Sequence, residues 1–566
     1  MARRRPMRMA YSPVTTMLRR SYVAVDQALE RDMPVEEVMG EHDEKRAKAL
    51  KGRRLKREEM AERRHFLQTS LGLTGAALGA ALLGVARPAF AGHGDPEVRV
   101  IIIGGGLSGL RCAHRLDTLG VATTLYEAHP SRLGGRCFSD TTFFEEGAEV
   151  EHGGSFINTE HTAMRNLVIS LGFNLREING GGFGDGEPFY HIDGAFYTNA
   201  EANDDWFDMQ PKFRQALVDA PYPQTFDAHT EEAVRLDNLL MADWLTEIGA
   251  PDRFSKLVQV DAVMEYGTDI EETHALAPLY LMAFNGRSEI EPLTGGDERF
   301  GVIGGNDQVI TAMADALPPG TIVMGKELIA VSGNADGPYT LTFEDGTTDV
   351  ADHLVLALPI SKLRELNIKK PLFKTFRPAK QLAIKNMLMA KNSKLHLQFN
   401  ERTWTNPVDV GGGQILTPNG ICYQFPLTGF QLTWDETVGE PGVTKGVLLS
   451  WFGGSRVDTL RGSEPFGVAD PADVNEFLNG IDLIYPGTKA AYNGLALKTQ
   501  PTLNPFVKGS YMGLPLGGYT SFFGAMGLQE GNIHFAGEHA NIDFWGFLDG
   551  AVREGRRVAQ DIHDQV

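Results

Sequence analysis

The sequence predicts an α/β fold with a parallel sheet, on observations from both ends of the chain. Val98 to Ile103 is an apolar run of the kind expected for a strand buried on both faces. A glycine-rich turn and a segment with helical spacing follow, up to Gly120, and a second apolar run covers Val121 to Tyr126. Near the carboxyl end, Ile533 to Phe535 is strand-like and precedes a helical segment that runs toward Ile562. Strands that alternate with helices in this way form parallel sheets.

The turn after the first strand has the spacing of a dinucleotide-binding site. Gly104, Gly106 and Gly109 form a G-x-G-x-x-G sequence, in which the first glycine permits a tight turn, the second lets the backbone approach a pyrophosphate and the third lets helix pack on strand. Glu127 lies 18 positions after Gly109, close to the ~20 expected for the acid that binds ribose hydroxyls. Strand, turn, helix and acid together predict a bound dinucleotide, whereas the turn alone would also fit an ordinary βα loop.

Length, cysteine content and charge exclude some classes of protein. The 566 residues are enough for several domains, and the three cysteines have no metal-binding spacing and argue against a disulfide scaffold. The net charge of −20 is uneven, because residues 1–91 carry 18 Lys and Arg against 11 Asp and Glu, so this segment is +7 and the remainder −27. The acidic remainder disfavours nucleic acid and anionic membranes as partners and mildly favours cationic small molecules, although acidic surfaces are more often merely solvated.

Two segments precede the first strand. Residues 1–62 are rich in Arg, Lys and Glu without a wide apolar face, so we expect them to be disordered or transiently helical. Residues 63–91 resemble a twin-arginine export signal, with Arg63-Arg64, a 16-residue apolar run from Leu71 to Ala86 and an Ala-x-Ala sequence that ends at Ala91. The apolar run is shorter than the ~20 residues of a spanning helix. We therefore expect export by the twin-arginine machinery, cleavage after Ala91 and a periplasmic or secreted protein, with membrane anchoring as the alternative.

Further glycine-rich segments extend the dinucleotide site toward a known family. Arg132-Leu133-Gly134-Gly135-Arg136 follows Glu127, and two guanidiniums around a glycine pair suit a close approach to pyrophosphate and flavin. Glu151-His152-Gly153-Gly154 comes next, and Gly537-Glu538 and a helix start after Gly546 lie near the carboxyl end. This set resembles the flavin-containing amine oxidases, which include monoamine, polyamine and L-amino-acid oxidases. The resemblance covers residues 98–566, strongly at both ends and weakly between, and the link before Arg132 is one residue longer than in that family.

The resemblance implies a Rossmann-type FAD-binding domain with an inserted, mixed α+β substrate domain. Residues 98–160, 296–365 and 505–566 would form the FAD-binding domain, and 161–295 and 366–504 the substrate domain. The residues implied to contact FAD are Gly104, Gly106, Leu107, Ser108, Gly109, Glu127, Ala128, Arg132, Gly134, Gly135, Arg136, Gly153, Gly154, Ser155, Phe156, Leu328, Gly537, Glu538, Gly546, Phe547 and Leu548. Ser510 stands where covalent members of the family have the cysteine that bonds the flavin, so FAD is expected to be non-covalent.

Periodicity predicts further elements between these motifs. Helices are predicted over 161–171 and 309–317, and amphipathic runs over 233–246 and 251–262, while the glycine tract 179–186 is predicted to be a loop. Strands are predicted over 321–324, 328–331, 339–343, 353–357, 393–399 and 447–452, with a hairpin turn at Asp345-Gly346.

The activity implied by the resemblance is the oxidation of a small-molecule amine. A hydride equivalent would pass from the carbon beside nitrogen to flavin N5, and the imine would hydrolyse to an aldehyde or ketone and release ammonia or an amine. O₂, reduced to H₂O₂, or another acceptor would reoxidise the flavin, and a homodimer is compatible with the family. The protein would supply orientation, a dry pocket and control of amine protonation. No metal or Ser/His/Asp triad is predicted.

Three residues match the family's catalytic positions. Lys394 matches the lysine that holds a water at flavin N5, where its charge would help O₂ accept the first electron; the alternatives are Lys391 or a merely solvated strand charge. Tyr511 and Phe547 match two aromatic positions that flank the substrate nitrogen and sort flat or cationic groups. The alternative is that both rings are core residues. Phe547 replaces a more usual Tyr or Trp, and the neighbouring Trp545 is expected to compensate in binding the substrate.

The sequence favours an amine over an amino acid as substrate. An L-amino-acid oxidase needs an arginine to bind the carboxylate, but its position falls near Phe156, and no arginine occurs before Arg165. Glu160 is closer and would suit a second cationic group, as in a diamine, although a solvated loop acid is the alternative interpretation. An L-amino-acid oxidase, a carbon–carbon desaturase on the same fold and a flavin-binding protein without turnover remain as alternative functions.

Overall fold

The structure is a computed structural model that describes residues 98–178, 187–283, 285, 290, 297–410, 414–415, 422–425 and 430–566. The segments predicted over residues 1–62 and 63–91 and the loop predicted over 179–186 lie outside these described residues. Within them, no helix has both the length and the apolar character needed to cross a membrane.

A five-stranded parallel sheet carries the predicted dinucleotide motif. Its strands are β1 (Val100–Ile103), β2 (Thr123–Tyr126), β9 (Ile322–Val323), β13 (His353–Leu356) and β25 (Ile533–Phe535). Their order is β25-β13-β1-β2-β9, and every neighbouring pair is parallel. β1 lies at the centre with all four residues buried, which confirms the prediction for the apolar run. β2 begins two residues later than predicted, because the Val121 N–H closes the end of the preceding helix on the Leu116 carbonyl.

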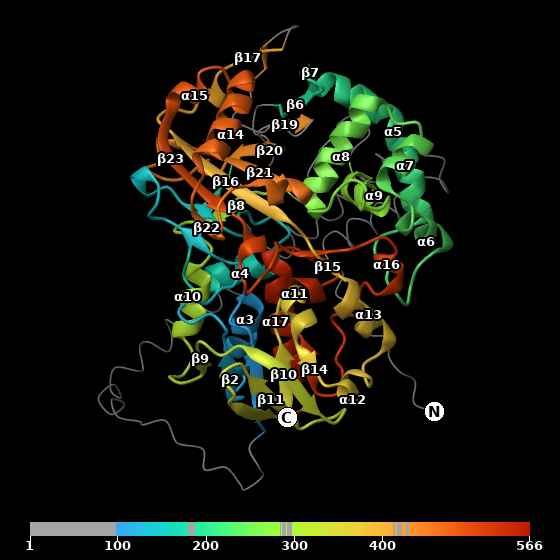
Figure 1. Ribbon diagram of the computed structural model, residues 1–566, viewed down its shortest axis with the longest axis vertical. Helices are drawn as coiled ribbons and strands as arrows, with labels where there is room; N and C mark the ends of the chain where they lie inside the picture. The colour runs from blue at the N-terminus through green and yellow to red at the C-terminus, as the bar shows by residue number, and fades with distance from the viewer. Residues whose placement is uncertain are drawn as a thin grey trace, which may run out of the picture. The chain divides into compact units, whose positions relative to one another are not determined.

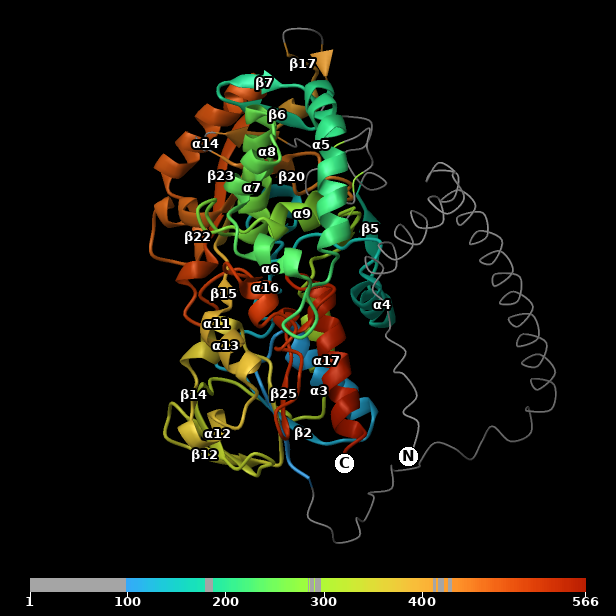
Figure 2. The same ribbon diagram turned by 90° about the vertical axis from the view of Figure 1, so that its right-hand side faces the viewer.

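Two helices far apart in the sequence pack together against this sheet. α3 (Leu107–Thr118) follows the glycine turn, and α17 (Leu548–His563) is the last helix of the chain (Figures 1 and 2). A Cβ at Gly555 of α17 would lie 2.3 Å from the Ser108 carbonyl oxygen of α3, so only glycine permits this close packing. α4 (Thr162–Ser170) and α10 (Gln308–Asp315) contribute to the same apolar core, as their predicted helical periodicity requires.

The second large sheet has eight strands in the order β22-β23-β16-β21-β20-β19-β6-β7. These strands are β6 (Phe189–Ile192), β7 (Ala195–Tyr197), β16 (Asn392–Phe399), β19 (Cys422–Phe425), β20 (Leu432–Asp435), β21 (Gly446–Gly453), β22 (Phe466–Val468) and β23 (Tyr492–Thr499). α14 (Pro471–Ile484) packs on the face that presents Leu395, Leu397 and Phe399 of β16. Since side chains alternate along a strand, Lys394 points to the opposite face.

A group of helices accompanies the eight-stranded sheet. It comprises α5 (Asn199–Asp219), α6 (Glu231–Asp237), α7 (Met241–Glu247), α8 (Asp252–Tyr266) and α9 (Leu276–Met282), and α8 contacts β6, β19 and β21 (Figure 1). The amphipathic run predicted over 233–246 is divided between α6 and α7. The break occurs because the Met241 N–H and the Leu239 carbonyl bond to the backbone of Thr273 and Ala275 instead of continuing a helix.

A smaller sheet contains the predicted hairpin. Its order is β12-β11-β10-β14, formed by β10 (Leu328–Gly333), β11 (Tyr339–Phe343), β12 (Thr348–Ala351) and β14 (Asn367–Ile368). The turn predicted at Asp345-Gly346 joins β11 to β12, a strand that was not predicted. The other strands and α-helices are β3 (Ser139–Asp140), β4 (Val150–Glu151), β5 (Leu175–Glu177), β8 (Phe300–Val302), α11 (Ile360–Glu365), α12 (Lys370–Phe373), α13 (Pro378–Asn386), β15 (Leu388–Met389), β17 (Val408–Asp409), β18 (Gln414–Ile415), α15 (Thr488–Ala491), β24 (Met512–Gly513) and α16 (Gly518–Ser521).

The strands are distributed between the two large sheets as the predicted segments require. Every strand of the parallel sheet comes from residues 98–160, 296–365 or 505–566, and every strand of the eight-stranded sheet comes from 161–295 or 366–504. The predicted limits of the two domains themselves stay a prediction.

The central position of β1 leads to a stability prediction. Ile102 is fully buried, so Ile102→Ala removes buried methyl and methylene groups and should lower the free energy of unfolding by about 2–5 kcal/mol. Ile169→Ala is the matched control, because that side chain is 60% exposed on α4. Denaturant unfolding followed by fluorescence measures both variants, and equal destabilisation of the two would contradict the central role of β1.

Candidate active site

The glycine turn after β1 contains two glycines at which a Cβ would clash with the backbone and one at which a Cβ would fit. A Cβ at Gly104, where φ is +104°, would lie 2.6 Å from the Ala357 carbonyl oxygen, and a Cβ at Gly109 would lie 2.0 Å from the Gly104 carbonyl oxygen. At Gly106 the nearest atom to a Cβ would be the Gly134 carbonyl oxygen, at 3.8 Å. Gly106 therefore borders the free space in front of the first turn of α3.

The N-terminus of α3 has the properties of a phosphate-binding site. No side chain caps the helix, and the buried Ser108 hydroxyl has no hydrogen-bond partner among the described residues. Unpaired N–H groups, an orphaned hydroxyl and the positive end of the helix dipole suit a phosphate. These groups fit the pyrophosphate of FAD.

Glu127 lies beside the same turn. Its carboxylate accepts the Gly105 N–H at 2.6 Å and, across Ala128, the His129 N–H of its own loop at 2.7 Å. The acid is thus held at the end of β2, next to the glycine turn, where the predicted ribose contact requires it. Leu328, which the resemblance implies as an FAD contact, is buried at the start of β10.

The Arg-x-Gly-Gly-Arg segment packs directly on the glycine turn. The Gly134 N–H donates to the Gly105 carbonyl at 2.9 Å, and Gly134 also forms a bridge with Gly106. Arg132 Nη1 donates to the carbonyls of Leu133 and Gly135 at 3.2 and 3.0 Å, so this guanidinium braces its own loop.

Arg136 joins this segment to the carboxyl end of the chain. Its Nη1 atom lies 2.7 Å from Glu538 Oε1, across 402 positions of sequence, and donates to the Ser510 carbonyl at 2.9 Å. Glu538 also accepts the N–H groups of Gly546 and Met512, at 2.9 and 3.2 Å. Burial opposes ionisation of Glu538, but Arg136 and these donors outweigh it and hold the pKa of the carboxyl below its usual value.

The segment after β4 lies between this ion pair and the last helix. A Cβ at Gly153 would come within 1.7 Å of the Arg136 carbonyl oxygen, and one at Gly154 would lie 3.3 Å from Leu548 Cγ at the start of α17. Gly546 has φ of +80°, and no side chain caps α17 at Phe547. The Gly153–Gly154 segment and the start of α17 therefore lie side by side, and the uncapped N-terminus of α17 would stabilise negative charge on a bound flavin.

Lys394 contacts the Glu151–Ser155 segment, which begins at the last residue of β4. Its Nζ donates to the carbonyls of Glu151 and Gly153, both at 2.8 Å, and to Ser155 Oγ at 2.5 Å. Burial lowers the pKa of the Lys394 ammonium, while the nearby Glu436 and Glu151 carboxyls oppose that shift. Lys391, the alternative, is instead exposed and pairs with Asp458 at 2.5 Å.

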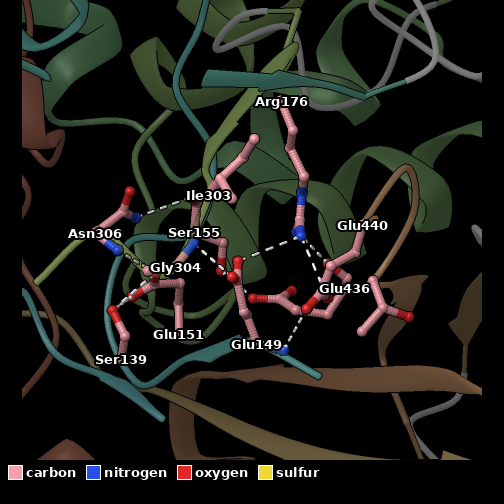
Figure 3. Close-up of polar contacts among 12 residues, drawn as sticks. Ser139, Glu149, Glu151, Ser155, Arg176, Ile303, Gly304, Asn306, Glu436 and Glu440 are labelled. Carbon is pink, nitrogen blue, oxygen red and sulfur yellow. Dashed lines mark hydrogen bonds and ion pairs between the residues drawn. The ribbon is translucent and has the colours of Figure 1, made fainter. Parts of the chain in front are cut away.

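A network of buried polar groups supports the Glu151–Ser155 segment (Figure 3). Glu151 accepts the Ser139 hydroxyl at 2.9 Å and the Asn306 N–H at 2.7 Å, and burial raises the pKa of its carboxyl well above the usual value. Asn306 Nδ2 donates to the carbonyls of Gly154 and Ser155 at 2.8 and 3.0 Å. No local sequence signal points to these contacts, since the tract around Asn306 predicts only the start of a helix.

Two acids near the Ser155 end of this network were also missed. Glu436 accepts the Ser155 hydroxyl at 2.6 Å and the Trp434 indole N–H at 2.7 Å, and lies 3.7 Å from Lys394 Nζ. Glu440 lies 3.2 Å from Arg176, and burial raises its pKa to about 7 (Figure 3). Both follow strand β20, and long-range pairing brings Glu436 near Lys394 and Glu440 near Arg176.

The two predicted aromatic residues, Tyr511 and Phe547, contact different parts of the protein. The Tyr511 hydroxyl donates to the carbonyls of Glu265 and Met264, at 2.7 and 3.3 Å, and its ring lies within 4 Å of the Cβ position of Gly546. The Phe547 ring lies 4.7 Å from the His161 ring, centre to centre. That Tyr511 and Phe547 together flank a substrate nitrogen stays a prediction.

The other predicted contact residues are Trp545, Phe156 and Glu160. Trp545 lies 5.6 Å from Tyr266, ring to ring, and Phe156 lies 6.1 Å from Trp434. Glu160 is half-buried in the loop before α4, and its role stays a prediction.

Comparison with known proteins identifies the class that this fold and site define. Residues 107–563 match the model of the family described as flavin containing amine oxidoreductase, so the chain belongs to this family. It is a flavin-dependent enzyme that oxidises amines with FAD as cofactor.

Individual relatives cover most of the chain. A protein named polyamine oxidase 5, from Oryza sativa subsp. japonica, is 25% identical over 475 residues, which are 82% of this chain and 87% of that protein. An L-amino-acid oxidase from Vipera ammodytes ammodytes is 22% identical, over 85% of this chain and 96% of its own. The solved structure of cyclohexylamine oxidase from Brevibacterium oxydans IH-35A superposes with a TM-score of 0.69 at 22% identity, over 83% of this chain and 99% of that one, and supports the fold.

The unequal surroundings of the glycines lead to a prediction about cofactor binding. The protein itself has room for the Cβ of Gly106→Ala, so the apoprotein should keep its thermal midpoint. The same Cβ would intrude on the predicted position of the pyrophosphate. The FAD content should therefore fall by about tenfold or more, which is equivalent to ~1.4 kcal/mol of binding free energy. Gly109→Ala is the matched comparison, because its Cβ would collide with the Gly104 carbonyl and should destabilise the apoprotein as well. Flavin absorbance relative to protein and melting of the deflavinated variants measure the two effects. Full retention of FAD by the Gly106→Ala variant would contradict the assignment.

Proposed function

We propose that this enzyme oxidises a primary or secondary amine with non-covalent FAD, uses O₂ as electron acceptor, and acts after export. The observation that carries the proposal is the position of Lys394 Nζ, within hydrogen-bond distance of Gly153 and Ser155. The Gly153–Ser155 segment also lies against Arg136 and the start of α17. Lys394 is therefore proposed to share one site with the two flavin-binding motifs, the Arg132–Arg136 segment and the start of α17.

In this proposal the glycine turn, the Arg132–Arg136 segment and the start of α17 would hold FAD, which would supply the acceptor for a hydride from the substrate carbon and the donor of electrons to O₂. The protein orients the amine and excludes water. Lys394 provides a buried cation next to the Gly153–Ser155 segment, held by acceptors on three sides. A positive charge at this position stabilises the negative charge that develops on O₂ when O₂ is reduced.

Tyr511 and Phe547 are proposed to orient the substrate through the placement of their rings. Tyr511 is held by hydrogen bonds to the backbone of α8, and burial raises the pKa of its hydroxyl well above the usual value, so the ring stays neutral. Phe547 has no polar group, so its proposed role is limited to shape and ring contact. Flat apolar walls lower the local dielectric and favour a neutral, reactive amine nitrogen.

Non-covalent FAD is proposed from the hydroxyl at Ser510. The Ser510 Oγ atom lies 2.9 Å from the Ala390 carbonyl and 2.6 Å from Asn392 Oδ1, both as acceptors, and a serine lacks the thiolate chemistry of a flavin-bonding cysteine. Acid precipitation should release all of the flavin into the supernatant.

Export and assembly are proposed from the sequence alone. The arginine pair, apolar run and Ala-x-Ala sequence within residues 63–91 support twin-arginine export with cleavage after Ala91. Cell fractionation and the N-terminal sequence of the exported protein test this proposal. A homodimer is proposed only from the family resemblance.

Anaerobic bleaching of the oxidised flavin tests the proposed reaction directly. Monoamines or diamines should bleach the purified holoenzyme, and the bleached enzyme should return to the oxidised spectrum on admission of O₂ with formation of H₂O₂. Bleaching by L-amino acids alone would overturn the amine proposal in favour of an L-amino-acid oxidase. No bleaching by either class would leave a desaturase or a non-catalytic flavoprotein.

The position of Lys394 gives a separable kinetic prediction. Lys394→Met should slow reoxidation by O₂ at least about tenfold, because ~1.4 kcal/mol of transition-state stabilisation corresponds to that factor. In the unsubstituted enzyme this rate should fall as the pH rises through a lysine pKa lower than the usual 10.5, since the ammonium is then lost.

Lys391→Met is the matched control for this experiment, because Lys391 is exposed and paired with Asp458. Stopped-flow mixing of reduced enzyme with O₂ measures both variants over a range of pH. A larger effect at Lys391, or an unchanged pH profile in Lys394→Met, would contradict the role proposed for Lys394.

A further inference from the structure

A cavity lies between the loop after β2, strand β22 and the loop after β23. Its volume is about 510 Å³, within the roughly 300–1,000 Å³ typical of small-molecule pockets. Val468 at its edge is 76% exposed, so the cavity is reached from solvent. Among the described residues that line it, Arg132 is also implied as an FAD contact, but none belongs to the glycine turn, to Gly153–Ser155 or to α17. The cavity is therefore distinct from the proposed amine site.

Three packed rings form the apolar wall of the cavity. The Phe138 and His152 rings stack with their centres 4.5 Å apart, and the Phe466 ring meets both edge-on, at 5.4 and 4.8 Å. His152 is fixed by the 2.6 Å contact between its Nδ1 atom and Thr499 Oγ1, and burial lowers its pKa to about 4, so this ring is neutral. The wall is thus flat, aromatic and uncharged, which suits a planar ring.

The loop after β2 supplies two donor groups to the same cavity. His129 Nδ1 accepts the N–H groups of Ser131 and Arg132, at 3.1 and 2.9 Å, so its ring proton lies on Nε2. The Arg132 guanidinium lies 4.5 Å from the centre of the Phe138 ring, and only its Nη1 atom donates to the carbonyls of the loop. Within the described residues, neither His129 Nε2 nor Arg132 Nη2 has an acceptor.

Asn504 supplies a third donor from the opposite loop. This side chain lines the cavity and is only 5% exposed. Its Oδ1 atom accepts the Phe506 N–H at 3.0 Å, which fixes the orientation of the amide. The Nδ2 group donates to no atom in the part of the chain that the structure describes. Because a nearly buried amide donor without an acceptor is costly, a ligand that brings an acceptor is favoured here.

Asp140 is an acid in the lining, but its own turn stabilises it. Its Oδ1 atom accepts the Thr142 N–H at 2.8 Å, the Thr142 hydroxyl at 3.1 Å and the Phe143 N–H at 2.9 Å. The donors of His129, Arg132 and Asn504 lack such partners. The unmatched groups of the cavity are therefore predominantly donors, one of them cationic, which suits an anionic head group.

We propose that this cavity, the Phe138–Phe466 pocket, binds a planar aromatic carboxylate. The ring of the ligand packs against Phe138 and Phe466, and its carboxylate faces the donors of His129, Arg132 and Asn504. This inference goes beyond the proposed function and does not depend on the oxidation of an amine.

Calorimetric titration of the holoenzyme with 2-naphthoate tests the pocket. The neutral 2-naphthamide has nearly the same shape and is the comparison probe. The carboxylate should bind about tenfold or more tightly than the amide, because hydrogen bonds to an ionised acceptor are the stronger ones. Neither probe carries an oxidisable amine, so binding is measured without turnover.

Asn504→Asp separates the carboxylate from the ring. The variant keeps an oxygen to accept the Phe506 N–H but replaces the donor by a second oxygen. Binding of 2-naphthoate should weaken about tenfold or more, while binding of 2-naphthamide changes less than about threefold. Asn367→Asp is the matched control, because Asn367 is exposed on β14 and does not line the cavity, and it should change neither.

Phe466→Ala tests the aromatic wall independently. Loss of this ring should weaken both probes about tenfold, because both stack on the same surface. Phe207→Ala is the matched control, since Phe207 is 47% exposed on α5 and lies outside the cavity lining.

Each remaining outcome decides against one proposal. Equal binding of the two probes, or unchanged binding of 2-naphthoate in both Asn504→Asp and Phe466→Ala, would overturn the pocket. Displacement of 2-naphthoate by an amine that bleaches the flavin would assign the carboxylate to the amine site and would also overturn it. Failure of every amine to bleach the flavin, with 2-naphthoate binding still dependent on Asn504 and Phe466, would overturn the proposed oxidation and keep the pocket.

Discussion

The ion pair between Arg136 and Glu538 is the contact on which the rest of the site depends. Glu538 is almost fully buried, so its charge is tolerable only because Arg136 and two backbone N–H groups face it. The same arginine holds the Ser510 carbonyl, and its own carbonyl oxygen touches the glycine of the Gly153 segment. The pair therefore sets the mutual position of the N-terminal glycine turn, the segment beneath Lys394 and the start of α17.

The electrostatics of the site follow from this arrangement. The buried ammonium of Lys394 is surrounded by carbonyl oxygens and by Glu151 and Glu436, which partly offset the desolvation that lowers its pKa. Three acids of the site lie beside a cation, since Glu538 faces Arg136, Glu440 faces Arg176 and Glu436 faces Lys394. Burial raises the pKa of the Glu151 and Glu440 carboxyls, which lowers the cost of burying these acids.

The sequence was most informative where function depends on consecutive residues. The glycine turn, Glu127 and the Arg132–Arg136 segment were predicted correctly as neighbours, because strand, turn and helix are local structures and the second strand must lie beside the first. Periodicity also located β16 and β21, and strand alternation separates Lys394 from the core residues on either side of it. Ser139, Asn306 and Glu436 could not be found in this way. Each becomes part of the site only through pairing of segments more than a hundred residues apart or through a loop contact, and none stands in a recognisable pattern.

The interleaving of the parallel sheet has a consequence for how the protein matures in the cell. β1 and β2 come early in the chain, β9 and β13 near its middle and β25 close to its end, and α17 packs on α3 across more than four hundred positions. A ribosome must therefore release almost the whole polypeptide before the five-stranded sheet is complete and α17 can pack on α3. Cofactor capture is a post-translational event for such a topology, and the nascent chain must be kept from aggregation until its last helix is available.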